Sequence, residues 1–138
     1  TSFYYRGRTG AAPSASPRAA APAVDGAPVA EWRSASGSRA RFGKLTGDYN
    51  GVHLSDWYAR LFGFRAAFQH PQRALGQILA HLPGMQRRLP IRLDAWLKGP
   101  VYYGAKLTLR AEAGGSAFAL FVEGDDRPAI LGRLAAVA

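Results

Sequence analysis

The chain has 138 residues, 48% of them hydrophobic, which is enough for one domain with a real core and too little for two. It has no cysteine, so disulfides, thiolate catalysis and cysteine-based zinc sites are excluded. The formal net charge of +9 favours an anionic partner, whether nucleic acid, a membrane surface or a phosphorylated small molecule. No apolar run approaches the roughly 18 residues that a membrane span needs, so we predict a soluble, cytoplasmic protein.

The amino-terminal part divides into two pieces of different composition. Residues 2–8, SFYYRGR, place three consecutive aromatics before two arginines, and we predict that residues 1–8 contain a short packed strand. Residues 9–31 are rich in Ala, Pro, Ser and Gly and lack a periodic apolar face, so they predict a linker. Residues 32–138 then form the globular domain.

Two helices are predicted in the middle of the chain. Ser55 is a suitable N-cap with Asp56 in the first turn, and the helix ends at Gly63. Its larger apolar residues fall on one side: Trp57, Tyr58, Leu61 and Phe62. The second helix starts after Pro71 and stops at Pro83-Gly84. Its apolar residues are spaced i, i+3, i+4 and i+7, the pattern of a core face: Leu75, Ile78, Leu79 and Leu82.

Beyond Pro90 the apolar pattern changes to a two-residue alternation, which is typical of half-buried strands. Segments starting at residues 91, 105, 117 and 129 are predicted strands, and Gly114-Gly115 and Gly124-Asp125-Asp126 are predicted turns between the last three. Helices followed by an antiparallel meander give an α+β domain with the long helix on one face of the sheet.

The segment GDYNGVH, residues 47–53, holds the strongest candidates for chemistry. Asp48 and His53 are five residues apart and share no helical face, so they meet only if the chain turns between them, which Asn50 and Gly51 permit. The alternative interpretation is a turn that contains a histidine with no functional role, because such a turn has the same spacing. In a dry pocket the two side chains form a general acid–base pair. The three histidines lack metal-site spacing, so no metal is predicted.

These residues carry a resemblance to a known family. GDYNGVH followed by Ala59 resembles the signature of the MaoC-like dehydratases, the (R)-specific enoyl-thioester hydratases of the hotdog fold. Gly63-Phe64 with His70 resembles that family's entry to its central helix, and residues 99–104, GPVYYG, resemble its Pro-Val-x-x-Gly connection. The resemblance covers about residues 40–138 and implies an antiparallel sheet wrapped around a central helix.

The resemblance also implies roles for individual residues. Asp48 and His53 would activate and position water and exchange the proton at the substrate α carbon, while Gly47 and Asn50 would support their loop. The family has a proline where this chain has Gly51. The family also has a glycine after the histidine at the helix start, whose N–H polarises the thioester oxygen. Here that position is Pro71, which has no N–H, and the N–H of Gln72 or a neighbouring group would replace it. His70 is expected to be structural.

The implied substrate is a CoA or acyl-carrier thioester, with no separate cofactor. Cations that could meet the phosphates of CoA are Arg73, Arg87, Arg88 and Lys98, although each also suits a plain surface. We expect a homodimer or a pairing with a second hotdog module, the chain being the carboxy-terminal module of a tandem protein or a member with a shortened first half. A non-catalytic acyl-thioester-binding hotdog is the alternative function. Nucleic-acid binding has no supporting motif and is not expected.

Overall fold

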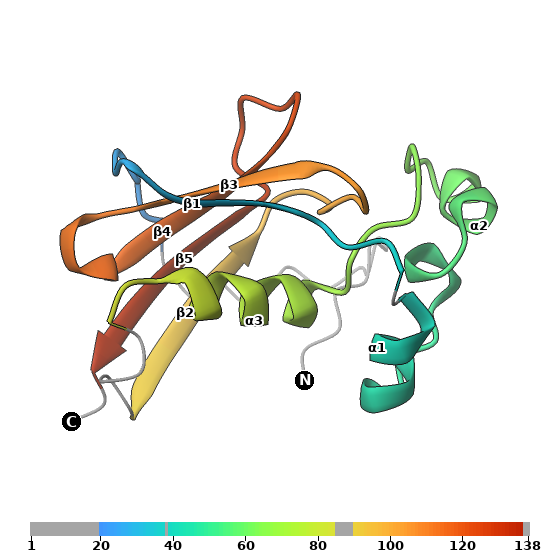
Figure 1. Ribbon diagram of the computed structural model, residues 1–138, viewed down its shortest axis with the longest axis horizontal. Helices are drawn as coiled ribbons and strands as arrows, with labels where there is room; N and C mark the ends of the chain where they lie inside the picture. Colours follow the sequence, from blue (N-terminus) through green and yellow to red (C-terminus); the bar gives the residue numbers. More distant parts are fainter. Residues whose placement is uncertain (1–19, 38, 85–89, 137–138) are drawn as a thin grey trace, which may run out of the picture.

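The computed structural model describes residues 20–37, 39–84 and 90–136. Within these residues the chain forms a five-stranded antiparallel sheet and three α-helices, which confirms the predicted α+β class (Figure 1). The elements in chain order are β1 (Pro28–Arg33), α1 (Arg39–Thr46), the 3-10 turn η1 (Gly51–His53), α2 (Asp56–Leu61), α3 (Pro71–His81), β2 (Ile91–Leu97), β3 (Lys106–Ala111), the 3-10 turn η3 (Ala113–Gly115), β4 (Ala117–Val122) and β5 (Ile130–Ala136).

The strand order in the sheet is β1-β3-β4-β5-β2. The predicted meander therefore holds for β3, β4 and β5, but it is wrong for β2, which pairs with β5 at the far edge. The reason lies in the connection after β2, which makes no hairpin. Lys98 and Gly99 donate their N–H groups to Ala129 O, and Val101 O accepts from Gln69 N, so the chain crosses to the opposite side before β3 begins.

The predicted linker is wrong at its carboxy-terminal end, because β1 begins at Pro28 within the range 9–31. This segment becomes a strand because its backbone pairs with β3, with Glu31 opposite Thr108 and Trp32 opposite Leu107. Glu31 also forms an ion pair with Lys106 at 2.8 Å. The strand predicted in residues 1–8 and the linker up to residue 19 lie outside the described residues.

The core lies between the sheet and α3, which the sheet curves around (Figure 1). The predicted stripe on α3 faces inward: Ile78 and Leu82 are buried, and Leu75 and Leu79 pack against the core. From the sheet side Phe118 is fully buried, and its ring fills the space that a Cβ on Gly132 would need. Burial of such a large apolar side chain contributes about 1.5–3 kcal/mol to folding.

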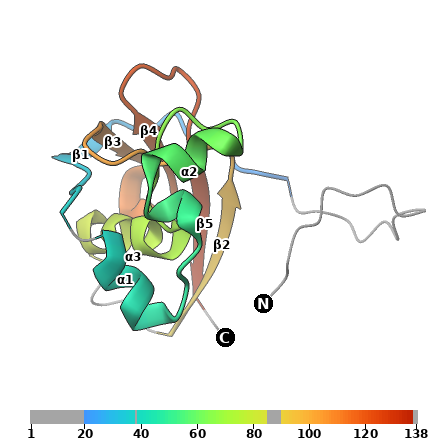
Figure 2. The same cartoon turned by 90° about the vertical axis from the view of Figure 1, so that its right-hand side faces the viewer.

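A second, smaller part of the molecule holds α1, α2 and the loop between them, beyond the amino-terminal end of α3 (Figure 2). Its own buried cluster consists of Val52, Ala59 and Ala67. Ser55 caps α2 as predicted by accepting from Tyr58 N at 3.4 Å. The apolar side of α2 is exposed, and Trp57 is 68% accessible. Within the described residues, no helix has the length and apolar character to cross a bilayer.

Candidate functional site

The loop between α1 and η1 is built by the side chains of the GDYNGVH segment itself. Gly47 has φ +73°, a left-handed conformation that favours glycine. Asp48 Oδ1 accepts from Asn50 N at 3.1 Å, and Asn50 Oδ1 accepts from Val52 N at 3.3 Å, which caps η1. These successive side-chain turns fold the chain back between Asp48 and His53, so the local sequence explains why two residues five apart approach each other.

His53 is buried, with 7% of its surface accessible. Its Nδ1 lies 3.0 Å from Phe68 O. Because a carbonyl oxygen only accepts, Nδ1 carries the proton and Nε2 keeps a free lone pair. Burial lowers the pKa of His53 below its ordinary value, His70 lowers it further, and the bond to Phe68 and the charge of Asp48 oppose the shift. A neutral imidazole with a free Nε2 is the form that accepts a proton.

His70 contacts both His53 and the backbone of Asp48. Its side chain is fully buried, and its ring is 4.1 Å from that of His53 between centroids. Nε2 of His70 lies 3.0 Å from Asp48 O and therefore donates to that backbone carbonyl, while its Nδ1 is buried without a protein partner in the described residues. His70 thus ties the Asp48 loop to the start of α3, a bond between residues 22 apart in the chain.

One side-chain nitrogen or carboxylate oxygen from each of Asp48, His53 and His70 lies within 4.8 Å of those of the other two. The structure therefore brings the two predicted acid–base residues together and adds His70 to them. The Asp48 side chain is 45% exposed and accessible to a substrate. Such a trio could also hold a metal ion, but the His70 nitrogen nearest to Asp48 already donates to a carbonyl oxygen. A metal at that nitrogen would have to displace this bond and its proton, which favours the acid–base interpretation.

The start of α3 forms the other side of this region. Pro71 occupies the first helical position and has no N–H. Gln72 follows with an exposed side chain, and its N–H belongs to the first-turn amides that a helix leaves without an i−4 acceptor. Gly51 also has a packing role, because a Cβ at this position would lie 2.6 Å from the ring of Tyr58. The larger residue that the family carries here would displace that ring.

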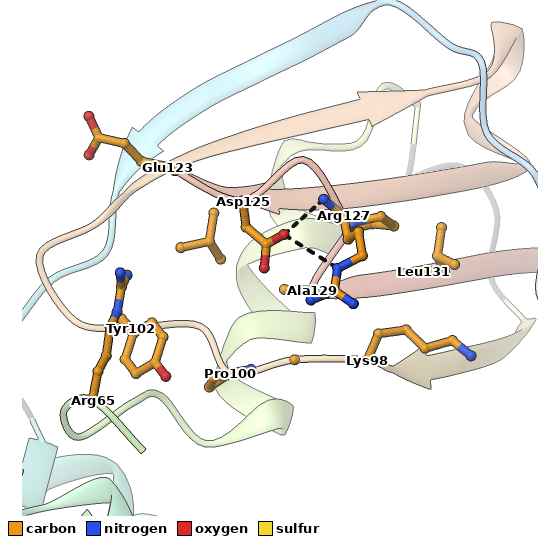
Figure 3. A pocket seen from close by; sticks show the side chains of 13 residues that line it. Arg65, Lys98, Pro100, Tyr102, Glu123, Asp125, Arg127, Ala129 and Leu131 are labelled. Carbon is orange, nitrogen blue, oxygen red and sulfur yellow. Dashed lines mark hydrogen bonds and ion pairs between the residues drawn. The ribbon is translucent and has the colours of Figure 1, made fainter. Parts of the chain in front are cut away.

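Two neighbouring cavities share residues 98–100, and neither is lined by Asp48 or His53. The smaller one has a volume of about 290 Å³ and is mostly apolar, with Phe64, Phe68 and Leu97 among its walls, and Pro71 borders it. The ring of Phe68, which lines this cavity, is 4.9 Å from that of His53 between centroids, so Phe68 contacts both the cavity and the acid–base pair. The second cavity has a volume of about 520 Å³ (Figure 3).

The cations predicted to meet phosphates are not gathered in one place. Lys98 lines both cavities, whereas Arg73 lies on α3 with its guanidinium 5.9 Å from the ring of Tyr103. Arg87 and Arg88 fall outside the described residues. Sequence reasoning missed Arg65 and Arg127, which line the larger cavity with Lys98. No spacing signals them, because they come from separate loops that only the fold brings together.

Comparison with known proteins identifies the fold. No family model and no curated protein sequence matches the chain. Solved structures do: HtdX of Mycobacterium tuberculosis has a TM-score of 0.66 at 22% identity over 80% of this chain and 48% of its own. An (R)-hydratase of A. caviae involved in PHA biosynthesis has a TM-score of 0.60 at 17% identity over 84% of this chain and 97% of its own. R-hydratase PhaJ1 of Pseudomonas aeruginosa has a TM-score of 0.56 at 20% identity, covering 82% and 86%.

These similarities show that the chain has the hotdog fold, which confirms the predicted fold. The chain spans about half the length of HtdX and nearly the whole of the A. caviae hydratase. At identities of 17 to 22% the likeness concerns the fold. The chemistry has to be argued from the residues of the site.

Proposed function

We propose that the protein is an enoyl-thioester hydratase, adding water reversibly to a trans-2-enoyl thioester to give a 3-hydroxyacyl thioester. One observation carries the proposal: a buried His53, whose Nδ1 bonds to Phe68 O and whose Nε2 is left as the acceptor, stands beside the carboxylate of Asp48. The match of GDYNGVH to the hydratase signature and the shared fold with two (R)-hydratases support it.

The geometry suggests which side chain transfers protons and which positions the water. Water attacks the β carbon of the enoyl group and gives up one proton to the acid–base pair, and the α carbon receives a proton from the same pair, so water is added across the double bond without a net change of protein protonation. His53 Nε2 accepts a proton in this cycle, and the partly exposed Asp48 carboxylate positions the water. The reverse steps give dehydration.

Negative charge develops on the thioester oxygen while the α carbon is being protonated. A helix N-terminus stabilises such charge through its free amides and its dipole. In this chain Pro71 cannot donate, so we assign the donor role to Gln72 N–H, the next amide along α3. The donor is then one residue further along α3 than in the family. The hydratase activity depends on how well the thioester oxygen can reach the Gln72 N–H.

A second candidate function has one specific observation in its favour. Pro71 removes the first amide at the helix start, and the apolar cavity is lined by Phe68 but by neither Asp48 nor His53. A hotdog that binds an acyl thioester without hydrating it would have these features. Binding of a thioester without any turnover distinguishes this function from the first.

We also propose that the domain pairs with a second hotdog, either another copy or a companion module. The exposed apolar side of α2 and Leu97, 53% exposed at the end of the edge strand β2, support the pairing. A stable monomer in size-exclusion chromatography, at all concentrations and with no companion module, contradicts pairing between copies.

The test of the activity is hydration of crotonyl-CoA, followed by loss of the enoyl absorbance. Asp48→Ala and His53→Ala are each expected to lower kcat by roughly 10²–10⁴-fold, the usual contribution of a positioned acid or base. His81→Ala is the matched control, since His81 also bonds a carbonyl through Nδ1 but lies at the far end of α3 against Trp32. If wild type and variants are equally inert, also with longer enoyl chains, the hydratase proposal fails.

A further inference from the structure

His70 contacts both members of the acid–base pair from the start of α3. Its ring lies 4.1 Å from that of His53 between centroids and is tilted by 31° to it, so the two imidazoles face each other. Its Nε2 donates to Asp48 O at 3.0 Å, and the same nitrogen lies 3.9 Å from the carboxylate of Asp48. One fully buried side chain therefore contacts the proposed proton acceptor and the residue proposed to position the water.

The orientation of the His53 ring depends on this contact. Phe68 holds one edge of the ring, because Phe68 O lies 3.0 Å from Nδ1 and the Phe68 ring meets the imidazole at 81°. A single hydrogen bond at Nδ1 leaves an imidazole free to swing about that bond. His70 covers a face of the ring and limits this swing, so that Nε2 of His53 keeps one direction.

His70 is itself held on both sides by backbone hydrogen bonds. Gln69, the residue before it, donates its N–H to Val101 O at 2.8 Å. The carbonyl oxygen of His70 accepts from Arg73 N at 3.0 Å and from Ala74 N at 3.2 Å in the first turn of α3. The His70 imidazole therefore moves only if its own backbone angles change or the start of α3 moves.

Pro71 restricts those backbone angles. A proline ring clashes with the residue before it when that residue is helical, so the preceding residue is kept in the extended region. His70 has a φ of −57° and a ψ of 134°, and this ψ lies in the range that a following proline enforces. With any other residue at position 71, His70 could adopt helical angles and α3 could start one residue earlier. That change would rotate the imidazole relative to Asp48.

We propose that His70 is a positioning residue for Asp48 and His53, and that Pro71 locks His70 in the conformation that this role requires. The inference deepens the proposed function and rests on it for the effect on rate, whereas the effect of His70 on the loop rests on the geometry alone. The proposal also gives Pro71 a role, since a glycine at this position offers an amide but no such lock.

The first experiment measures the loop without any substrate. Amide hydrogen exchange is followed by NMR at Val52 and His53, whose N–H groups bond to the side chain and the carbonyl of Asn50. His70→Gln keeps an N–H donor at a reach similar to that of Nε2, whereas the shorter His70→Asn loses the bond to Asp48 O. We expect exchange at the two amides to be roughly tenfold faster in His70→Asn and nearly unchanged in His70→Gln.

His81→Asn is the matched control for these variants. His81 also lies on α3 and donates from Nδ1 to a carbonyl, Gln77 O at 2.8 Å, but at the other end of the helix. It should leave exchange in the loop unchanged. Equal exchange in wild type and His70→Asn overturns the proposal. An equal acceleration in the strands β3 and β4 also overturns it, because His70 would then support the whole fold rather than the loop.

Pro71→Ala tests the lock separately. Alanine restores the amide at the start of α3 but allows helical angles at His70. We expect exchange at Val52 and His53 to become roughly two- to fivefold faster, since a proline that fits its native conformation restricts the chain by about this factor. If Pro71→Ala leaves exchange unchanged, Pro71 is not a lock and that part of the proposal is wrong.

The tautomers of the two histidines provide a second test that is independent of activity. Both rings have a carbonyl oxygen as partner, so His53 carries its proton on Nδ1 and His70 carries one on Nε2. Long-range correlations between ring protons and ¹⁵N nuclei should therefore show a protonated Nδ1 for His53 and a protonated Nε2 for His70. A bare Nε2 on His70 excludes the bond to Asp48 O and overturns the proposal.

Hydration of crotonyl-CoA connects the inference to the proposed function. A positioning role predicts that His70→Asn lowers kcat by roughly 10- to 100-fold with little change in KM, and that His70→Gln restores most of it. Burial is the main cause of the lowered pKa of His53, and His70 adds to it, while Phe68 O and the charge of Asp48 oppose it. Replacement of His70 by glutamine should therefore move the acidic midpoint of kcat to higher pH.

The combined results separate this inference from the hydratase proposal. An inert chain in which His70→Asn still accelerates exchange in the loop refutes the hydratase and supports the positioning role. An active chain in which His70→Asn changes neither kcat nor exchange refutes the positioning role and leaves the hydratase intact. Equal losses of kcat in His70→Asn and His70→Gln, with an unchanged pH midpoint, show that the ring only fills space, which also overturns the inference.

Discussion

The sheet with α3 and the segment from α1 to Phe68 are stabilised in different ways. Within the described residues, thirteen buried apolar residues form the core of the first region, and only Val52, Ala59 and Ala67 form that of the second. The second region holds together through polar bonds instead, such as His53 Nδ1 to Phe68 O and Asp56 Oδ1 accepting from Ala67 N. The dense region provides the stability, and the polar region positions the candidate acid–base residues.

This difference has a dynamic consequence. Segments with few buried apolar contacts open locally at a lower free energy than the core does. The loop with Asp48, His53 and α2 is such a segment, and it is attached to the rigid start of α3 through His70. Changes in the core should therefore act on global unfolding, and changes in the loop should act mainly on the site.

The largest effect on stability is expected for Phe118→Ala. Phe118 is fully buried between β5 and the helix side of the core, so its truncation should lower the free energy of unfolding by about 3–5 kcal/mol. Urea denaturation followed by circular dichroism measures it. Phe121→Ala, on the same strand but half-buried beneath Arg110, is the control and should cost less. Equal costs would mean that the core is not where the burial pattern places it.

Asn50→Ala tests the polar region by a smaller change. Its Oδ1 caps η1 through Val52 N, so its loss should lower the free energy of unfolding by about 0.5–2 kcal/mol. The effect on kcat should be larger, up to about 10²-fold, because the loop sets the position of Asp48 and His53. Asn50→Asp retains an oxygen acceptor and should restore most of both quantities. If stability falls and kcat does not, the loop geometry is irrelevant to the reaction.

Much of the fold followed from the sequence, since the apolar stripe of α3, the cap at Ser55 and the β3–β4–β5 alternation are local signals. The missed features depend on distant partners. β1 forms because β3 offers an edge, and α1 was not predicted because its sequence, RARFGKLT, has only a weak apolar face. β2 reaches the far edge through bonds of residues 98 and 99 to Ala129 O, which no local pattern shows.

The features of the site also differ in whether local sequence or distant residues determine them. The approach of Asp48 to His53 was predicted from a seven-residue motif that folds by its own side-chain turns. The tautomer of His53 depends on Phe68 O, 15 residues away, and the fixing of Asp48 depends on His70, 22 residues away. Arg65 was missed for the same reason, because only the folded chain brings it to Tyr102 and Lys98.

The protonation of His53 gives a pH-dependent prediction for the polar region. Burial is the main cause of its lowered pKa, so the folded protein resists protonation more than the unfolded chain, whose histidine has the ordinary value of 6.5. As pH falls through 6.5 the unfolded state gains protons first, and stability decreases until the lower pKa of the folded state is passed. The hydration rate should stay constant from pH 8 to about 6.5 and fall with a midpoint below it. A rate that falls with a midpoint above 6.5 contradicts this assignment. His53→Gln should remove the part of the pH dependence of the unfolding free energy that comes from His53.

The smallest effect is expected for Trp57→Ala on α2. Trp57 is 68% exposed, so in a dilute, unpaired chain its loss should change the free energy of unfolding by no more than about 0.5 kcal/mol. Trp32→Ala is the contrasting variant, because Trp32 is half-buried, packs on the core and stacks on His81 at 4.4 Å, so its cost should exceed 1 kcal/mol. Denaturation at several protein concentrations completes the comparison. A cost for Trp57→Ala that grows with concentration would show that a second copy covers the apolar side of α2, and the polar region would then owe its stability to a partner as well as to its own hydrogen bonds.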